Sequence, residues 1–306
     1  MDPSLLLEQT LNGLTLGVML FLLAAGLTLI FGVMDVINLA HGSLYMAGAF
    51  ASAAVTARTG SFAAGVLAGI AVGAAFALVL ELALIRRLYA RAHLDQVLAT
   101  FAVILIANET VKILFGPQPI FAAPPPALAG SVELLPGVPY PAYRLVIIAV
   151  GLLAALFLWW LIGRTRLGML IRAGTTHRCM VQALGVNIEV LFAFVFAIGG
   201  ALAGLAGAMA GPILAVQVGM GEQILILAFV VVVIGGLGSV RGAFLAALLV
   251  GLTDTMSRAL LPSLMRDLLP PAAADQVAAN LGSVAVYLLM AVVLAVRPRG
   301  LFPAHG

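Results

Sequence analysis

The chain has 306 residues, of which 63% are hydrophobic and 9% are charged, and its mean hydropathy is +1.20. A soluble domain of this length could not bury so much apolar surface, so the composition excludes that class and indicates a membrane protein. The apolar runs are continuous and do not alternate with polar residues, which excludes an outer-membrane β-barrel. We therefore expect an all-α, polytopic bundle of transmembrane helices that forms one domain over residues 1–306.

The net charge of +3 and the isoelectric point near 9.4 do not call for a nucleic-acid partner. Lys and Arg accumulate in the cytoplasmic loops of membrane proteins, and this placement explains the excess. One cysteine, Cys179, excludes an internal disulfide and a multi-cysteine metal site. The first ten residues contain no Lys or Arg, so the first apolar run does not resemble a cleaved signal peptide.

In chain order, the apolar runs are long enough to cross a bilayer, which takes about 20 residues. They cover 11–33, 36–57, 61–85, 94–116, 143–163 and 188–212, followed by a block at 222–261 and a run at 278–296. The block at 222–261 has about twice the length needed for one pass. We expect eight or nine passes, with either two passes or one pass and a re-entrant segment in that block.

Two glycine-rich stretches predict close backbone contacts and a turn. Within 199–212, glycines four residues apart share a helix face, which favours tight packing against a neighbouring helix. The stretch 235–242, GGLGSVRG, is not a dinucleotide motif, because no strand precedes it and Arg241 takes the place of the third glycine. It predicts a tight turn that interrupts the long block and is formed by Gly235, Gly236, Gly238 and Ser239.

Basic residues predict the orientation of the chain. Three regions, 86–93, 164–187 and the tail after 296, contain nine of the fifteen Lys and Arg residues, and Arg241 makes ten. If these regions are cytoplasmic, the N-terminus is periplasmic and the C-terminus is cytoplasmic. That orientation requires an odd number of passes, so 222–261 would cross twice and the total would be nine.

The predicted periplasmic loop at 117–142 contains eight of the fifteen prolines and one charged residue, Glu133. Proline fixes φ and removes a hydrogen-bond donor, so the loop should be stiff and irregular rather than helical. We interpret it as a rigid connector, and a docking surface for an external partner is the alternative.

Polar residues inside the apolar runs are candidates for a substrate path, because such residues usually face an interior or a water-filled route. Asn38 and His41 are three apart and would share a face in a helix. Hydrogen bonding between helices is the alternative for both residues. For Asp254, a partner within the bundle is more plausible than contact with substrate. The candidate path residues are Asn38, His41, Gly42 and Asp254.

The sequence contains no enzymatic constellation. HExxH, GxSxG, a Cys/His ligand set and a phosphate-binding GxxxxGK[ST] loop are all absent. We therefore assign no catalytic residue, no metal ligand and no bound cofactor, and any ATP hydrolysis must come from other subunits.

Four segments carry a resemblance to a known family. They are 26–50 with INLAHG at 37–42, the stretch from RLGMLIRAG at 166 to 212, GGLGSVRGAFLAALLVG at 235–251, and RPRGLF at 297–302. Taken in this order, they resemble the permease family of ABC importers for branched-chain amino acids, of the LivH type. The four segments are distributed over nearly the whole chain.

The resemblance implies a permease domain in the bacterial inner membrane that imports branched-chain or other hydrophobic amino acids. It implies a second related permease, identical or not, two ATPase subunits that use ATP and Mg²⁺, and a periplasmic substrate-binding protein. The same scaffold also serves urea, short amides and other small solutes, so these substrates remain open. An ATP-independent secondary transporter or channel is the alternative from a different class.

The resemblance also implies that 164–187, a basic segment without an acidic residue, is a cytoplasmic loop that couples the permease to its ATPase. A solvated positive loop without a partner is the alternative. The family often has acidic or amide residues after the Arg-Ala pair, where this chain has Thr and His, so apolar insertion is favoured over charge pairing. Met180, Val181 and Leu184 would form one apolar stripe, with Arg172 and Arg178 as the charges that flank it. Ala173 also belongs to the coupling residues, and Gly185 would be the helix stop.

Overall fold

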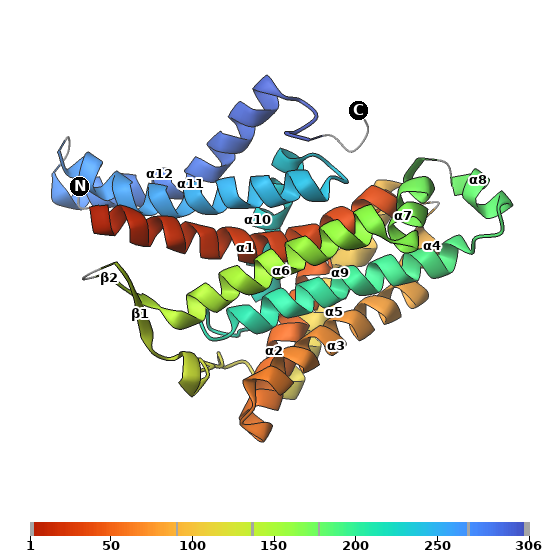
Figure 1. Cartoon of the computed structure of the whole chain (residues 1–306), viewed down its shortest axis with the longest axis horizontal. Helices are drawn as coiled ribbons and strands as arrows, with labels where there is room; N and C mark the ends of the chain where they lie inside the picture. Colours follow the sequence, from red (N-terminus) through yellow and green to blue (C-terminus); the bar gives the residue numbers. More distant parts are fainter. Residues whose placement is uncertain (1–2, 90, 136–137, 177, 268–269, 303–306) are drawn as a thin grey trace.

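The computed structural model describes residues 3–89, 91–135, 138–176, 178–267 and 270–302, and it confirms the all-α, polytopic bundle (Figure 1). The long helices are α1 (Pro3–Met34), α2 (His41–Thr59), α3 (Phe62–Leu80), α5 (His93–Phe115), α6 (Ala142–Arg164), α9 (Ile188–Ala210), α10 (Met220–Gly235), α11 (Val240–Arg266) and α12 (Pro271–Val296). The short elements are the π-helix η1 (Glu81–Ile85), α4 (Arg86–Leu88), the 3₁₀ helix η2 (Pro126–Leu128), β1 (Ser131–Leu135), β2 (Val138–Pro141), α7 (Arg166–Thr176) and α8 (Arg178–Ala183).

The helices agree with the predicted eight or nine passes. Over the described ranges, seven helical segments are long and apolar enough to cross a membrane, and α10 is a shorter apolar helix of 16 residues. The less apolar α2 adds 19 residues, most of them buried. The block 222–261 divides into α10 and α11, so the predicted break near 235–240 is present.

The second predicted run differs from the structure at its start. Residues 35–40 are not helical, and Asp35 has a positive φ of 55° directly after α1 ends. The helix α2 begins only at His41, so Asn38 lies in the connection and does not share a helix face with His41. The sequence pattern did not show this, because Val36, Ile37, Leu39 and Ala40 are apolar and continue the run into α2.

The helix α1 lies at the centre of the bundle (Figure 1). Over its most apolar stretch 83% of the residues are buried, compared with 17% for α12, and its neighbours include α6, α9, α10 and α11. The outer helices α5, α6 and α12 expose large apolar side chains, as expected of surfaces that face lipid: Ile113, Leu114, Leu153 and Val292.

Glycines allow the central helices to cross at very short backbone distances. A Cβ atom on Gly26 of α1 would lie 2.6 Å from the carbonyl oxygen of Gly199 in α9. One on Gly17 of α1 would lie 2.8 Å from the carbonyl oxygen of Ala247 in α11. These atoms belong to backbone, which cannot move aside as a flexible side chain can. Small residues at these crossings therefore determine how closely the helices pack.

The two ends of the bundle differ. The N-terminus and the β1–β2 hairpin lie at one end, and α4, α7 and α8 lie at the other (Figure 1). The antiparallel hairpin was not predicted in the Pro-rich stretch. Its second strand accommodates proline because Val138 and Tyr140 point inward while Pro139 and Pro141 are exposed.

A buried carboxylate joins three helices at the α7–α8 end. Glu81 is fully buried in the π-helix and accepts hydrogen bonds from the Tyr89 hydroxyl at 2.8 Å and from Arg86 at 3.2 Å. Arg86 also forms an ion pair at 3.0 Å with Glu189, in the first turn of α9. The Glu81 carboxylate is thus satisfied, and Arg86 links the end of α3 to the start of α9.

The glycine contacts predict a specific loss of stability. Gly26→Ala places a methyl group against the Gly199 backbone, and we expect the free energy of unfolding to fall by about 1–3 kcal/mol. Gly163→Ala in α6 is the matched control, because a Cβ there meets nothing within 4 Å. Thermal unfolding of the purified variants in detergent measures both effects. Equal midpoints for the two variants would contradict the packing account.

The two acids that contact Arg86 should differ in their effect on stability. Glu81→Gln removes a fully buried charge partner and should cost about 1–3 kcal/mol of unfolding free energy. Glu189→Gln removes a partner whose side chain is 62% exposed and should cost less than about 1 kcal/mol. The same thermal measurement compares them. A larger effect for Glu189→Gln would show that burial does not decide the strength of this cluster.

Candidate functional site

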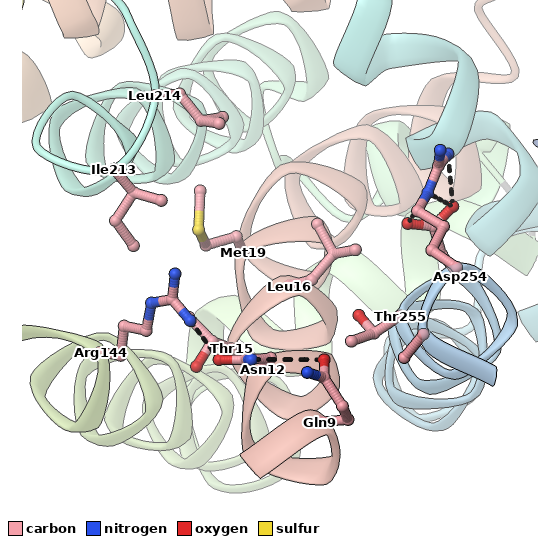
Figure 2. Close-up of a pocket in the computed structure, with 12 residues that line it drawn as sticks. Gln9, Asn12, Thr15, Leu16, Met19, Arg144, Ile213, Leu214, Asp254 and Thr255 are labelled. Atoms are coloured by element: carbon pink, nitrogen blue, oxygen red, sulfur yellow. Dashed lines mark hydrogen bonds and ion pairs between the residues drawn. The ribbon is translucent and has the colours of Figure 1, made fainter. Parts of the chain in front are cut away.

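A cavity of about 470 Å³ lies between α1, α6, α11 and the turn that follows α9 (Figure 2). From α1 it receives side chains between Gln9 and Met19, and from α6 it receives Arg144, which follows β2 closely. The cavity therefore belongs to the end of the bundle that holds the N-terminus and the hairpin. Three of its polar groups, Gln9, Asn12 and Thr15, recur every three residues and share a face of α1.

One side of the cavity is a hydrogen-bonded polar network. Arg144 donates to the side-chain oxygen of Asn12, and the buried Tyr140 hydroxyl donates to the same oxygen at 3.1 Å. Tyr140 also lies 3.2 Å from the Thr15 hydroxyl, and the Asn12 amide nitrogen lies 3.4 Å from the Gln9 side-chain oxygen. These contacts connect α1 with β2 and α6.

The other side of the cavity contains an ion pair within α11. Arg258 donates from Nε to both carboxylate oxygens of Asp254 at 3.0 Å, and from Nη2 to one of them at 2.9 Å. Asp254 is buried, yet it lines the cavity together with Thr255. This residue, singled out in the sequence, therefore has a partner within its own helix and a place in the cavity wall.

Apolar side chains separate the two polar sides. Leu16 and Met19 of α1 lie between Arg144 and Asp254 in Figure 2, and Ile213 and Leu214 come from the turn after α9. The cavity thus combines two separated polar regions with an aliphatic wall, an arrangement typical of small-molecule sites.

The other three candidate path residues lie away from this cavity. His41 is fully buried, and its Nε2 lies 3.2 Å from the Leu23 carbonyl oxygen. Asn38 is also buried and accepts from the Ala40 N–H at 3.0 Å. Gly42 lies against the backbone of Gly221, where α2 crosses α10. The structure therefore does not bring Asn38, His41 and Gly42 together with Asp254.

Asn38 and His41 each retain one nitrogen without a hydrogen-bond partner among the described residues, Nδ2 and Nδ1 respectively. Within the same ranges, no three His, Cys, Asp or Glu side chains are grouped so that they could hold a metal ion. The cavity residues Asn12 and Arg144 were not singled out in the sequence. The three-residue spacing of polar groups in the first apolar run was the signal that could have indicated that wall.

At the opposite end, α7 and α8 form the segment between α6 and α9. Arg172 donates to the Ile162 carbonyl oxygen at the end of α6, and Ala173 is half-buried. Arg178 begins α8, but its side chain lies outside the described residues, as does His177.

The helix α8 ends just before Gly185, which was predicted as the helix stop. Gly185 has a φ of 85°, and its N–H donates to the Gln182 carbonyl oxygen at 2.9 Å. The Val186 N–H donates to the Val181 carbonyl oxygen at 3.3 Å. These two hydrogen bonds form a Schellman motif, which ends α8.

The apolar stripe expected on α8 is divided. Met180 and Leu184 have 63% and 78% of their surface exposed, whereas Val181 is buried and has only 5% exposed. Neighbouring residues of a helix point about 100° apart, so Val181 faces the bundle when Met180 and Leu184 face outward. Two large apolar side chains are therefore presented on the surface of a segment that lies outside the long apolar helices.

The glycine-rich turn meets the C-terminal tail at the same end. Gly236 and Gly238 have φ angles of 101° and 81°, and the Ser239 side chain accepts from the Gly242 N–H at 3.1 Å. Gly235 packs against Gly242 where α10 and α11 meet.

The C-terminal tail forms hydrogen bonds with the end of α10. The N–H groups of Leu301 and Phe302 donate to the carbonyl oxygens of Ile234 and Gly235 at 2.8 and 3.0 Å, respectively. The tail thus satisfies carbonyl groups at the end of α10, a pairing that sequence spacing did not reveal.

The sequence of this chain is similar to those of several known permeases. A permease called LivH, from Escherichia coli K12 and named for high-affinity branched-chain amino acid transport, is 29% identical over 281 residues, covering 85% of this chain and 89% of the relative. BraD of Pseudomonas aeruginosa, whose name describes the same transport, is 31% identical over 262 residues, covering 81% and 85%. A probable LivH of Methanocaldococcus jannaschii is 27% identical over 252 residues, covering 78% and 76%. No solved structure matches the chain significantly.

A family model described as the permease component of branched-chain amino acid transport systems matches residues 9–295. This match includes the cavity, the α7–α8 segment and the glycine-rich turn. The chain belongs to the family of permease components of branched-chain amino acid transport systems.

Proposed function

We propose that this chain is the transmembrane permease subunit of an ATP-driven importer in the bacterial inner membrane. Its substrate is a branched-chain or other hydrophobic amino acid, delivered by a periplasmic binding protein. The observation that carries the proposal is the family match over 9–295, combined with the exposed Met180 and Leu184 outside the long apolar helices. Related permeases for urea or short amides are the alternative within the same scaffold.

The orientation is supported by charge. The end of the bundle that holds α4, α7 and α8 contains most of the basic residues, and such residues accumulate on the cytoplasmic side. Trp159 and Trp160 lie near the end of α6, and the Arg164 guanidinium lies 5.9 Å from the Trp159 ring centre. Aromatic residues of this kind are enriched at the membrane boundary. The N-terminus and the cavity are then periplasmic, and the C-terminus is cytoplasmic.

The coupling proposal assigns ATP and Mg²⁺ to two partner ATPase subunits, with a second permease subunit completing the transmembrane part. Met180 and Leu184 would insert into an apolar groove of an ATPase, while Val181 anchors α8 to the bundle. The helix α9 starts directly after this segment and ends just before Ile213 and Leu214 of the cavity wall. A displacement of α8 would therefore be transmitted along α9, whose 23 residues span about 35 Å.

The path residues Asn38, His41 and Gly42 stay a prediction. They are packed between helices in this state, so substrate would reach them only after α2 separates from α1 and α10. The glycine crossing of Gly42 and Gly221 is a contact at which such sliding would break few side-chain interactions. Alternating access by rigid movement of packed helices fits this arrangement.

Reconstitution in liposomes tests the function. With the partner permease, both ATPases and the binding protein, we expect labelled leucine to accumulate only when ATP and Mg²⁺ are supplied to the ATPase side. Liposomes that contain this chain alone are the control and should show no leucine flux. Flux through the chain alone would instead support an ATP-independent transporter or channel. Uptake of urea or acetamide without leucine uptake would identify the other substrate class.

Charge on the exposed face of α8 should uncouple transport. We expect Met180→Asp to reduce leucine uptake at least about tenfold, because a carboxylate in an apolar contact must be desolvated without a partner. Gln182→Asp is the matched control: it adds the same charge to α8, but about 160° around the helix from Leu184. Uptake, membrane insertion and co-purification of the ATPase are measured together. Normal uptake by an inserted Met180→Asp variant would contradict coupling through this face.

A further inference from the structure

The cavity contains one positive charge that no carboxylate neutralises. Arg258 is matched by Asp254 in the opposite wall. Arg144 has no ion pair within the described ranges, and its hydrogen-bond acceptor there is the neutral side-chain oxygen of Asn12. A guanidinium has five N–H donors, so most of its donors remain available. The wall formed by α1 and α6 is therefore suited to bind an anion.

The position of Arg144 is fixed by buried groups. Asn12 is held by the hydroxyl of Tyr140, a fully buried side chain, and Tyr140 in turn contacts Thr15. Figure 2 shows the Arg144 guanidinium next to Asn12, at the side of the cavity where α6 approaches α1. Because this network orients Asn12, the guanidinium has a defined position before any ligand arrives. Preorganisation of this kind favours binding.

The opposite wall offers hydrogen-bond acceptors, although its Asp254–Arg258 ion pair has no net charge. The two oxygens of a carboxylate accept up to about four hydrogen bonds. Arg258 supplies three to Asp254, so one acceptor position remains. The half-buried Thr255 adds a hydroxyl to the same wall. Between the Arg144 wall and the wall with Asp254 and Thr255 lie the aliphatic side chains of Leu16 and Met19.

We propose that this cavity is the site where the permease first receives its substrate, a zwitterionic α-amino acid with an aliphatic side chain. The α-carboxylate binds Arg144, the α-ammonium lies near Asp254 and Thr255, and the side chain contacts Leu16, Met19 and Leu214. This assignment rests on the proposed import of amino acids, and it adds a position and an orientation for the substrate. A solute without a carboxylate, such as an amide, would lack the interaction with Arg144.

Equilibrium binding of labelled leucine tests the site. The sample is the purified permease–ATPase complex without the binding protein, with leucine and leucinamide as unlabelled competitors. We expect leucinamide to compete roughly 10- to 100-fold more weakly than leucine, as expected from the loss of a charged hydrogen-bonded pair. Arg144→Gln should lower leucine affinity by a similar factor. Arg58→Gln is the control, because Arg58 is exposed and does not line the cavity.

A second variant covers the case in which Arg144→Gln does not insert into the membrane. Leu214→Glu adds a negative charge to the cavity wall at a side chain that is 45% exposed, so folding should be preserved. It should lower leucine affinity at least about tenfold by repelling the carboxylate. Leu134→Glu in β1 is its control, with a side chain that is 39% exposed and outside the cavity.

Several results would overturn the site while leaving the proposed function intact. They are equal competition by leucine and leucinamide, wild-type leucine affinity in Arg144→Gln or in Leu214→Glu, and import of leucine by a complex that binds none without the binding protein. A complete wild-type system that hydrolyses ATP but imports no leucine would instead contradict the proposed function. These two failures are therefore distinguishable.

Discussion

Backbone contact at glycine is the constraint on which this structure depends. The central helices α1, α2, α9, α10 and α11 meet where neither side has a Cβ atom, as at Gly26 with Gly199 and Gly42 with Gly221. In a membrane, packing of this kind replaces the hydrophobic effect as the source of helix association. Close crossings also bring buried polar groups such as His41 within reach of backbone carbonyls of the neighbouring helix. These contacts without interlocking side chains hold the central helices close together.

This packing gives the bundle two different ends joined by continuous helices. Near the N-terminus, α1, α6 and α11 form a cavity whose charges lie on opposite walls. At the other end, α8 presents apolar side chains, and the Glu81–Arg86–Glu189 cluster fixes the start of α9 to α3. Because α9 extends from that cluster to the edge of the cavity, movement at one end has a direct structural route to the other.

Much of the fold could be predicted from the sequence, because long apolar runs have one stable form in a bilayer. The break between α10 and α11 was also visible, since glycines mark it. The start of α2 was not, because four of the six residues in its connection to α1 are apolar, and a mainly polar stretch is the signal that marks a loop. The candidate sites were harder to predict. Asp254 was found as a charge in an apolar run, but Arg144 and Asn12 become partners only because α6 packs against α1. The direction of Val181 likewise depended on how α8 sits on the bundle.

In the proposed coupling, α8 is the mechanical contact between this permease and an ATPase on the cytoplasmic side. A photo-reactive amino acid at position 184, introduced in cells that express the complete transport system, tests it most directly. We expect an adduct with the ATPase subunit from position 184, and a much weaker one from position 182 on the opposite side of the helix. An adduct from position 184 with lipid or with the periplasmic binding protein, and none with the ATPase, would exclude this contact.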